Sequence, residues 1–260
     1  MYTTSTTYNN ILAGDHWFEC SVVIGESGRL VTEKGEYITF GGDNILVSQG
    51  SADSGFTESW IQSLKIEQSA FSEDAPSVGS ALSAELTLTM VRPAGAIPRM
   101  ALVRPYIRAV NDTQASEWIP QGIFYIDTRE YTQNDDNLSI LTIHAYDAML
   151  MTEQDYPSTT HEWTDFKDID VVREIADTLG IGVDARTVER MTAGYVISAP
   201  AGYSMREVLG YIAAMYGGNF VMNYDGELLL IALNSMPAET DYLVDGFGYA
   251  ITFGGDRILV

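Results

Sequence analysis

Two stretches of the chain, 213 positions apart, are nearly identical. Residues 30–47 read LVTEKGEYITFGGDNILV and residues 243–260 read LVDGFGYAITFGGDRILV, so that twelve of the eighteen positions match. Chance rarely gives such a match within one globular domain, and we interpret it as duplicated structure. Duplication is more typical of a part of an assembly than of an enzyme with one active site.

Each copy of the repeat is predicted to form a small β-hairpin. The β-branched and aromatic runs at 37–40 and 251–253 favour strands. The Gly-Gly-Asp segments at 41–44 and 254–257 are predicted to be four-residue loops, because glycine adopts positive φ at little steric cost. The hairpin serves either for packing alone or for docking. Its turn lacks the spacing of a phosphate or calcium loop.

Length and cysteine content limit the class of protein. A chain of 260 residues can form one large or two medium domains with a sizeable core. No apolar run approaches the length of a membrane helix, and the first residues lack the basic and apolar regions of a secretory signal. Cys20 is the only cysteine, which excludes an intrachain disulfide. We therefore expect folding in a reducing cytoplasm and no membrane anchoring.

The chain is strongly acidic. It has 36 Asp and Glu residues against 14 Lys and Arg, for a formal net charge of −22. Nucleic-acid binding needs basic side chains that displace counterions from phosphates, so no stable nucleic-acid binding is expected. Attraction to anionic membrane surfaces is disfavoured for the same reason. The acidic residues are scattered along the sequence, which indicates a solvated acidic surface and not an interaction tail.

The first part of the chain has the pattern of antiparallel strands. Strands are predicted at 18–24, 60–67, 85–91, 101–110, 119–130 and 138–146. In the second of these, Trp60, Gln62, Leu64 and Ile66 are expected to share a face, and Pro105 is expected to interrupt the fourth. Strands that arrive every 10–20 residues with turn signals between them predict an antiparallel barrel or sandwich. Residues 1–151 are therefore predicted to be an antiparallel β-barrel-like domain.

The pattern changes near Met151. Apolar residues at helical spacing predict a helix over 168–179, ended by Gly180, and a capping box of Ser204 and Glu207 predicts a helix over 205–216. Strands at 219–224 and 227–233 flank Asp225-Gly226, a two-residue turn signal. Residues 152–238 are thus predicted to be an α+β domain of two helices and a β-hairpin, followed by the hairpin repeat at 239–260. The fold class is mainly β with an α+β part.

No constellation of residues points to catalysis, a cofactor or a metal, so the predicted catalytic, cofactor-binding and metal residues are none. The candidates considered are His16, His144, His161, Cys20 and the pair Asp135-Asp136. The histidines lack metal-ligand spacing, Cys20 lacks a nucleophile signature, and the acidic pair sits at a predicted hairpin tip. Tyrosine and tryptophan are frequent, and core or interface packing is favoured for them over a sugar-binding platform.

Several segments together resemble a known family. They are EWIPQGIFYID at 117–127, LTIHAYDAML at 141–150, YSMREVLGYIA at 203–213, then Gly217-Gly218 and the Asp225-Gly226 hairpin. This ordered series is similar to tail proteins encoded by prophages of Gram-positive bacteria. Within these it resembles the baseplate-hub or tail-tip class, which shares its fold with the hub protein of contractile tails.

The resemblance implies a structural and non-enzymatic role. Such proteins have barrel-like β-domains joined by an α+β region, and they form a homotrimeric ring that joins the hexameric tail tube to a spike or tip. The implied partners are other tail proteins, namely tube, distal tail, and spike or tip proteins. The implied location is the virion tail, assembled in the bacterial cytoplasm. The repeat at 239–260 fits the start of a second barrel, and the chain is short for a complete hub.

Two other functions remain open. One is a carbohydrate- or receptor-binding module of the same particle, which should show exposed aromatic side chains around a concave site. The other is a tail-associated enzyme that degrades the cell wall, which should show a Cys/His or paired-carboxylate cleft. The scarcity of histidine and cysteine argues against the second.

Overall fold

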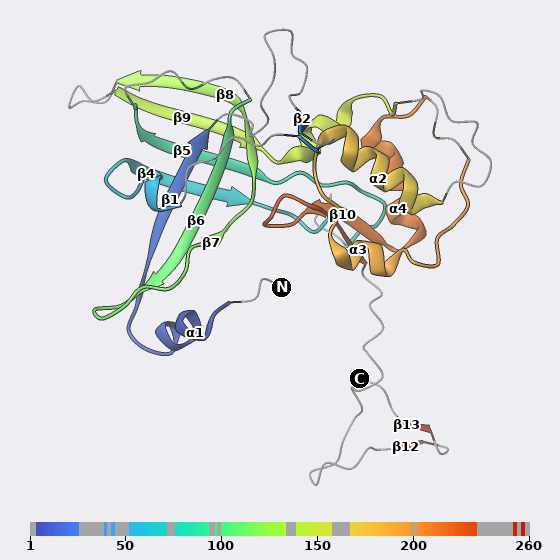
Figure 1. The fold of residues 1–260 in the computed structure, drawn as a ribbon, viewed down its shortest axis with the longest axis horizontal. Helices are drawn as coiled ribbons and strands as arrows, with labels where there is room; N and C mark the ends of the chain where they lie inside the picture. Colours follow the sequence, from blue (N-terminus) through green and yellow to red (C-terminus); the bar gives the residue numbers. More distant parts are fainter. Residues whose placement is uncertain are drawn as a thin grey trace.

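The computed structural model places most of the chain between Thr4 and Ala232, together with a few short segments. The residues it describes are 4–25, 39–40, 43–44, 52–71, 76–93, 97, 100–133, 139–157, 167–198, 200, 202–232, 252–253 and 256–257. These residues form a mainly antiparallel β structure with an α+β part, which confirms the predicted fold class. Figure 1 shows the large sheet beside the part that contains helices α2, α3 and α4.

The large sheet has seven strands in the order β1-β6-β8-β9-β5-β4, with β7 paired to β6, and its pairings are antiparallel. The strands are β1 (Trp17–Gly25), β4 (Ile61–Glu67), β5 (Glu85–Val91), β6 (Leu102–Val110), β7 (Ile119–Pro120), β8 (Phe124–Gln133) and β9 (Ser139–Tyr146). The described strands do not close into a barrel. One isolated bridge links β1 to the segment before β4: Val22 and Phe56 exchange two backbone hydrogen bonds of 2.8 Å.

Strand β5 shows why this sheet forms. Its residues alternate between buried and half-buried, and Leu86, Leu88 and Met90 are fully buried, as the period-2 pattern predicts. They pack with Phe124 and Ile143 in the core on one side of the sheet. The strand is flanked by β4 and β9, so both of its edges are paired. Burial of one apolar face therefore fixes the register of the sheet centre.

Strand β4 departs from its predicted alternation. The pairing with β5 shifts between Ile61 and Ser63, which marks a β-bulge or irregularity. Ile61 is half-buried and packs against the sheet core, whereas Gln62 is exposed. The prediction that Gln62 shares the inward face is therefore wrong, because an extra residue in one strand changes which side chains point inward.

Pro105 does not interrupt β6, contrary to prediction. It lies opposite Val22, whose backbone N–H and C=O are both bonded to Phe56 on the other side of β1. The Val22–Pro105 pair therefore needs no hydrogen bond between the two strands. The carbonyl of Pro105 accepts from the Gln121 N–H at 2.9 Å. The missing N–H of proline is tolerated at such a position.

The single strand predicted at 119–130 is two strands. β7 pairs with β6, and the chain then turns at Gln121–Ile123 before β8 begins at Phe124. Gly122 has a φ of 121°, a value that other residues rarely adopt, and a side chain there would collide with the Phe124 ring. The predicted pairing of this region with 138–146 is confirmed as β8–β9.

The α+β part is built around a second apolar core. Its elements are the 3-10 helix η2 (Ala148–Glu153), α2 (Asp168–Leu179), α3 (Ala185–Arg190), α4 (Met205–Met215), β10 (Gly218–Met222) and β11 (Leu228–Ala232). Helix α2 ends where Gly180 adopts φ 69°, and Ser204 and Glu207 form both bonds of the capping box at the start of α4. Both helices match the predictions. Helices α2 and α4 pack with Phe220 of β10 in the core.

Two short helices were not predicted. α1 (Thr6–Leu12) buries Ile11 alone, and α3 buries Thr187 alone. Helices of six or seven residues with one buried side chain carry no visible apolar period. Each is held by a cap: the Ser5 hydroxyl accepts from the Tyr8 N–H, and Asp184 accepts from the Arg186 N–H. A further short 3-10 helix, η1, spans Ala52–Ser54.

The β10–β11 ribbon is extended on both sides by residues of irregular segments. Leu82 donates to the Phe220 carbonyl and Phe220 donates to the Ser80 carbonyl, at 2.8 and 2.9 Å. On the other side Leu228 bonds with Gly182 and Asp184. All five residues of β10 are buried, so this strand is covered on both faces. The segment that contains Ser80 comes from within the predicted first domain.

The turn of the ribbon differs from the prediction. Met222 pairs with Leu228, which leaves five residues between the strands and not two. The Gly226 N–H donates to the Asn223 carbonyl at 3.0 Å, and Gly226 has φ 77°. Asp225-Gly226 is thus part of a longer turn, in which glycine supplies the left-handed residue.

The two copies of the sequence repeat share one pairing. β2 (Thr39–Phe40) pairs with β3 (Asp43–Asn44), and β12 (Thr252–Phe253) pairs with β13 (Asp256–Arg257). In both, the phenylalanine lies opposite the aspartate, which leaves two residues between the strands. The hairpins are confirmed, but the four-residue loops are wrong, because the aspartate and the residue after it belong to the second strand.

Candidate functional site

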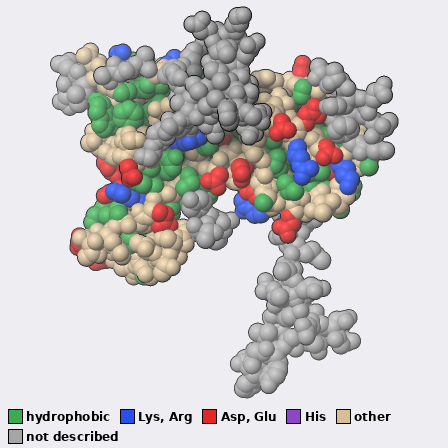
Figure 2. All heavy atoms as spheres, in the orientation of Figure 1, with side chains coloured by type: hydrophobic (Ala, Val, Ile, Leu, Met, Phe, Trp, Pro, Cys, Tyr) green, Lys and Arg blue, Asp and Glu red, His purple; other side chains and the backbone are tan. Residues whose placement is uncertain are grey.

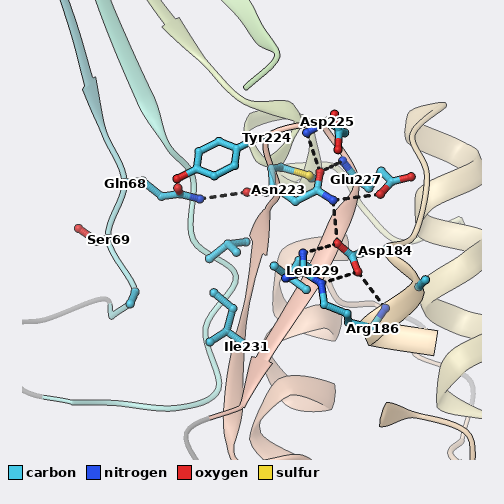
Figure 3. A pocket seen from close by; sticks show the side chains of 14 residues that line it. Gln68, Ser69, Asp184, Arg186, Asn223, Tyr224, Asp225, Glu227, Leu229 and Ile231 are labelled. Atoms are coloured by element: carbon cyan, nitrogen blue, oxygen red, sulfur yellow. Dashed lines mark hydrogen bonds and ion pairs between the residues drawn. The ribbon is translucent and has the colours of Figure 1, made fainter. Parts of the chain in front are cut away.

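A cavity lies between the β10–β11 ribbon and the segment that follows β4 (Figure 3). Its volume is about 690 Å³. Residues 68–70 form one wall, and the start of α3 and the ribbon form the others. The described lining residues are Gln68, Ser69, Ala70, Asp184, Ala185, Arg186, Val221, Met222, Asn223, Tyr224, Asp225, Glu227, Leu229 and Ile231.

A carboxylate–guanidinium pair lies at one side of the cavity. The Arg186 Nε and Nη2 donate to the two Asp184 carboxylate oxygens at 2.9 and 2.6 Å. The Arg186 N–H also donates to Asp184 Oδ1 at 2.8 Å, so the same carboxylate caps α3. Hydrogen bonding from Arg186 holds the pKa of Asp184 well below its usual range. This aspartate remains ionised and is occupied by its neighbours, so it cannot act as a general acid.

Asn223 connects this pair to the turn of the ribbon. Its Nδ2 donates to Asp184 Oδ2 at 2.8 Å and to Glu227 Oε2 at 3.0 Å. Its Oδ1 accepts from the N–H groups of Asp225 and Glu227, both at 2.9 Å. One amide side chain therefore fixes the shape of the turn and the position of two carboxylates, as Figure 3 shows.

The floor of the cavity is apolar. Val221, Leu229 and Ile231 come from the face of the ribbon that points away from the helices. Ile231 is 38% exposed, and in Figure 3 it extends from the ribbon into the cavity. Across the cavity, Gln68 Nε2 donates to the Met222 carbonyl at 3.0 Å and ties this wall to the ribbon. The arrangement is an apolar floor with a polar rim, which suits a side chain of a partner better than a reaction.

A second cavity of about 700 Å³ shares Arg186, Leu229 and Ile231 with the lining of the first. It is lined by Arg186, Glu189, Arg190, Leu229, Leu230, Ile231 and Ala232. Thr187 closes part of this edge: its hydroxyl accepts from the Leu230 N–H at 2.8 Å and donates to the Leu228 carbonyl at 3.3 Å.

Of the residues considered from sequence, His16, His144 and Cys20 do not line either cavity. His16 bonds to the Gly14 carbonyl, and His144 lies beside Thr87 and Glu85 on β5. Burial, together with the charge of Glu58, raises the pKa of the Cys20 thiol, which disfavours the reactive thiolate. His161 and Asp135-Asp136 lie outside the described residues.

Metal and membrane features are also absent from the part of the chain that is placed. Across the described ranges, no three His, Cys, Asp or Glu side chains are grouped so that they could hold a metal ion. None of the helices in these ranges has the length and apolar character needed to cross a bilayer. Acidic side chains are spread over both parts of the face seen in Figure 2.

Exposed aromatic side chains lie at several places on the described surface, and the rings of Tyr203 and Tyr211 contact each other edge to face, with centroids 5.5 Å apart. Trp17, Phe18, Tyr203 and Tyr211 are each at least 45% exposed, but they do not line the two cavities described above. Tyr224 is the exposed aromatic residue of the first cavity. A sugar-binding platform usually stacks its ligand on several such rings, and the described lining of the first cavity has one.

Sequence reasoning did not identify this cavity, because its walls come from three separate segments. Two local signals were present nonetheless. Asp184 precedes a short helix with Arg186 two positions later, and Asn223 precedes the Asp225-Gly226 turn. Each is a residue type that caps a helix or a turn. No sequence signal indicates that the two would be bonded to each other.

Comparison with known proteins gives similarities in structure alone. No protein-family model matches the sequence, and no curated protein matches it. The fold is similar to the 43 kDa tail protein of prophage MuSo2 from Shewanella oneidensis, with 11% identity over 88% of this chain and a TM-score of 0.49. It is also similar to a tail protein from Neisseria meningitidis MC58, with 13% identity over 82% of this chain and a TM-score of 0.42. The chain spans 59% and 51% of those two proteins.

Proposed function

We propose that the chain is a structural subunit of a phage tail or phage-tail-like particle. In this proposal it forms the baseplate-hub or tail-tip ring, as a homotrimer, and joins the tail tube to the spike. The role is non-enzymatic, the partners are other tail proteins, and the location is the virion tail. The division into a β-domain at 1–151, an α+β domain at 152–238 and a further hairpin repeat is part of the proposal.

The observation that carries the proposal is where the family-like segments lie. Segments 117–127 and 141–150 contain residues of the neighbouring strands β8 and β9, and the distant segment 203–213 meets them where the sheet joins the α+β part. Tyr125 of the first packs against the α+β core. The Met149 carbonyl of the second accepts from Arg206 Nη2 of the third at 3.3 Å. A series of motifs that builds one junction supports a shared scaffold better than a set of unrelated matches does.

Asp147 strengthens this junction. Its carboxylate accepts from the Ser83 hydroxyl, the Ala84 N–H and the Met149 N–H, at 2.8 to 3.0 Å. It is 2% exposed, and burial raises its pKa despite these bonds. One buried carboxylate thus connects Ser83 and Ala84, just before β5, to the start of η2. A rigid connection between two parts is what a load-transmitting ring subunit requires.

The test is localisation on assembled particles together with the mass of the isolated chain. A tagged full-length chain, produced in its source bacterium, should place gold label at the end of the tail tube next to the spike. Light scattering of the purified chain should give three times the mass of one 28.6 kDa chain. Label along the whole tube, or none on particles, overturns the tail-tip role. A purified chain that has the mass of a monomer overturns the trimeric ring.

A further inference from the structure

We propose that the cavity between residues 68–70 and the β10–β11 ribbon is a docking site for a partner protein. The partner presents an aliphatic side chain flanked by lysine or arginine, in an extended segment. The inference builds on the proposed assembly role, because it names the chemistry of one partner. The proposed site lies where the ribbon, α3 and the segment after β4 meet.

The shape of the site favours a side chain of a protein. The floor is made by Val221, Leu229 and Ile231, on the ribbon face opposite to the helices. Covering this partly exposed apolar floor with a side chain of a partner removes apolar surface from water, which favours binding. Hydrogen bonds from Gln68 to the Met222 carbonyl and from Asn219 to the Ala70 carbonyl tie the 68–70 wall to the ribbon. A preformed site of this kind reduces the entropy cost of binding.

The charges at the rim select the partner. Three carboxylates, those of Asp184, Asp225 and Glu227, line the cavity with one guanidinium, that of Arg186. Arg186 is already engaged in the two-pronged pair with Asp184. Asp225 is exposed at the turn, and Glu227 accepts from Asn223. The rim therefore carries an excess of negative charge, which attracts a basic segment and repels an acidic one.

The same charges disfavour a second copy of this chain as the occupant. Its net charge is −22, with 14 basic residues in 260. A contact between the same cavities of two copies would place two acidic rims against each other, and these rims repel. A different protein with a basic, partly apolar segment complements the rim without that cost.

The experiment titrates two labelled peptides into the full chain and measures fluorescence anisotropy. The first peptide alternates lysine with leucine and valine, and the second has glutamate in place of each lysine. The lysine peptide should bind at least tenfold more tightly than the glutamate peptide, and its affinity should fall as salt rises. Asp225→Lys should weaken it at least tenfold. Asp177→Lys, which makes the same charge change on the exposed side of α2, should change it less than twofold.

A second pair of variants tests the apolar floor. Ile231→Gln should weaken the lysine peptide at least fivefold, whereas Val196→Gln, at a 67% exposed position elsewhere, should leave its affinity unchanged. Circular dichroism verifies that each variant is folded. Equal binding of the two peptides, no binding of either, or no loss with Asp225→Lys overturns the proposal.

Sedimentation of the chain alone tests the other occupant. A dimer that Ile231→Gln abolishes would assign the site to a second copy and overturn the basic partner. These outcomes are separate from the particle-labelling test. A chain absent from tail particles can still bind the lysine peptide, and a tail-tip subunit can fail to bind it.

Discussion

Strands β5 and β10 show two different ways to hold a strand in this molecule. β5 buries every second residue, and its three inward side chains are apolar. β10 is buried at all five positions, and one of these is Asn219, which is 1% exposed. The large sheet is therefore held by apolar alternation on one face. The ribbon is held between helices and irregular segments, and it needs polar side chains to satisfy the backbone groups of those segments.

Asn219 shows what this second arrangement requires. Its Oδ1 accepts from the Ser80 N–H, and its Nδ2 donates to the carbonyls of Ala70 and Ser77, all within 2.9 Å. These three groups belong to irregular segments outside the named strands. A buried backbone group without a partner costs about 1–3 kcal/mol. The comparison teaches that the sheet tolerates polar changes on its outer face, whereas the ribbon depends on a few polar atoms.

The largest expected effect tests whether the two parts unfold together. Phe220→Ala empties the α+β core and should lower the free energy of unfolding by about 3–5 kcal/mol. Leu88→Ala in the sheet core should cost about 2–5 kcal/mol. Denaturation is followed by near-ultraviolet and far-ultraviolet circular dichroism. If the parts are separate cooperative units, each variant shifts one of two transitions. A single transition shifted equally by both would contradict the proposed division into two domains.

The second prediction concerns the polar bonds of the ribbon. Asn219→Ala should cost about 2–4 kcal/mol, because it removes three hydrogen bonds between a buried side chain and backbone groups. Asn219→Asp should cost at least as much at neutral pH, since a carboxylate cannot donate to the two carbonyls. The matched change in the sheet is Thr89→Val on the half-buried face of β5, expected within about 0.5 kcal/mol. Urea denaturation measures all three. Similar losses of unfolding free energy for Asn219→Ala and Thr89→Val would show that the ribbon does not depend on polar side chains more than the sheet does.

The sequence predicts most of the sheet for a physical reason. Alternation at β5 and the helical spacing of α2 are properties of neighbouring residues, so a local pattern contains them. Capping residues such as Ser204 and Glu207 are equally local. The bulge in β4 and the passage of β6 through Pro105 depend on the partner strand: Pro105 is accommodated because Val22 bonds to Phe56 instead. No pattern in one strand contains that information.

The candidate site could not be predicted, because it too depends on contacts between segments that are distant in the sequence. Asp184, Asn223 and Gln68 each have a local role that the sequence permits, as a helix cap, a turn residue and the continuation of a strand. Their joint position depends on the ribbon lying between α3 and the segment after β4. The register of the repeated hairpins was misjudged on a smaller scale, because the aspartate after two glycines fits a turn or a strand equally well.

The smallest expected effect concerns pH and the ion pair beside the cavity. Asp184→Asn should cost about 1–2 kcal/mol at pH 7, because it removes the charge from the bonds with Arg186. The pKa of Asp184 in the folded chain lies below that of an unfolded aspartate, about 3.9. The ionised carboxylate therefore stabilises the fold above that value, and the contribution is lost as pH falls below it, because the unfolded chain then takes up the proton first.

The measurement is urea denaturation of both proteins at pH 7, 5 and 3. The difference between them should stay constant from pH 7 to 5 and shrink at pH 3. Arg186→Gln provides the control, since it removes the other half of the pair. The double variant should then cost little more than either single one, because the two changes remove the same interaction. A difference that is unchanged at pH 3 would show that Asp184 acts as a neutral cap of α3. The ribbon would then resemble the sheet more closely, with its polar groups serving as hydrogen-bond partners and not as charges.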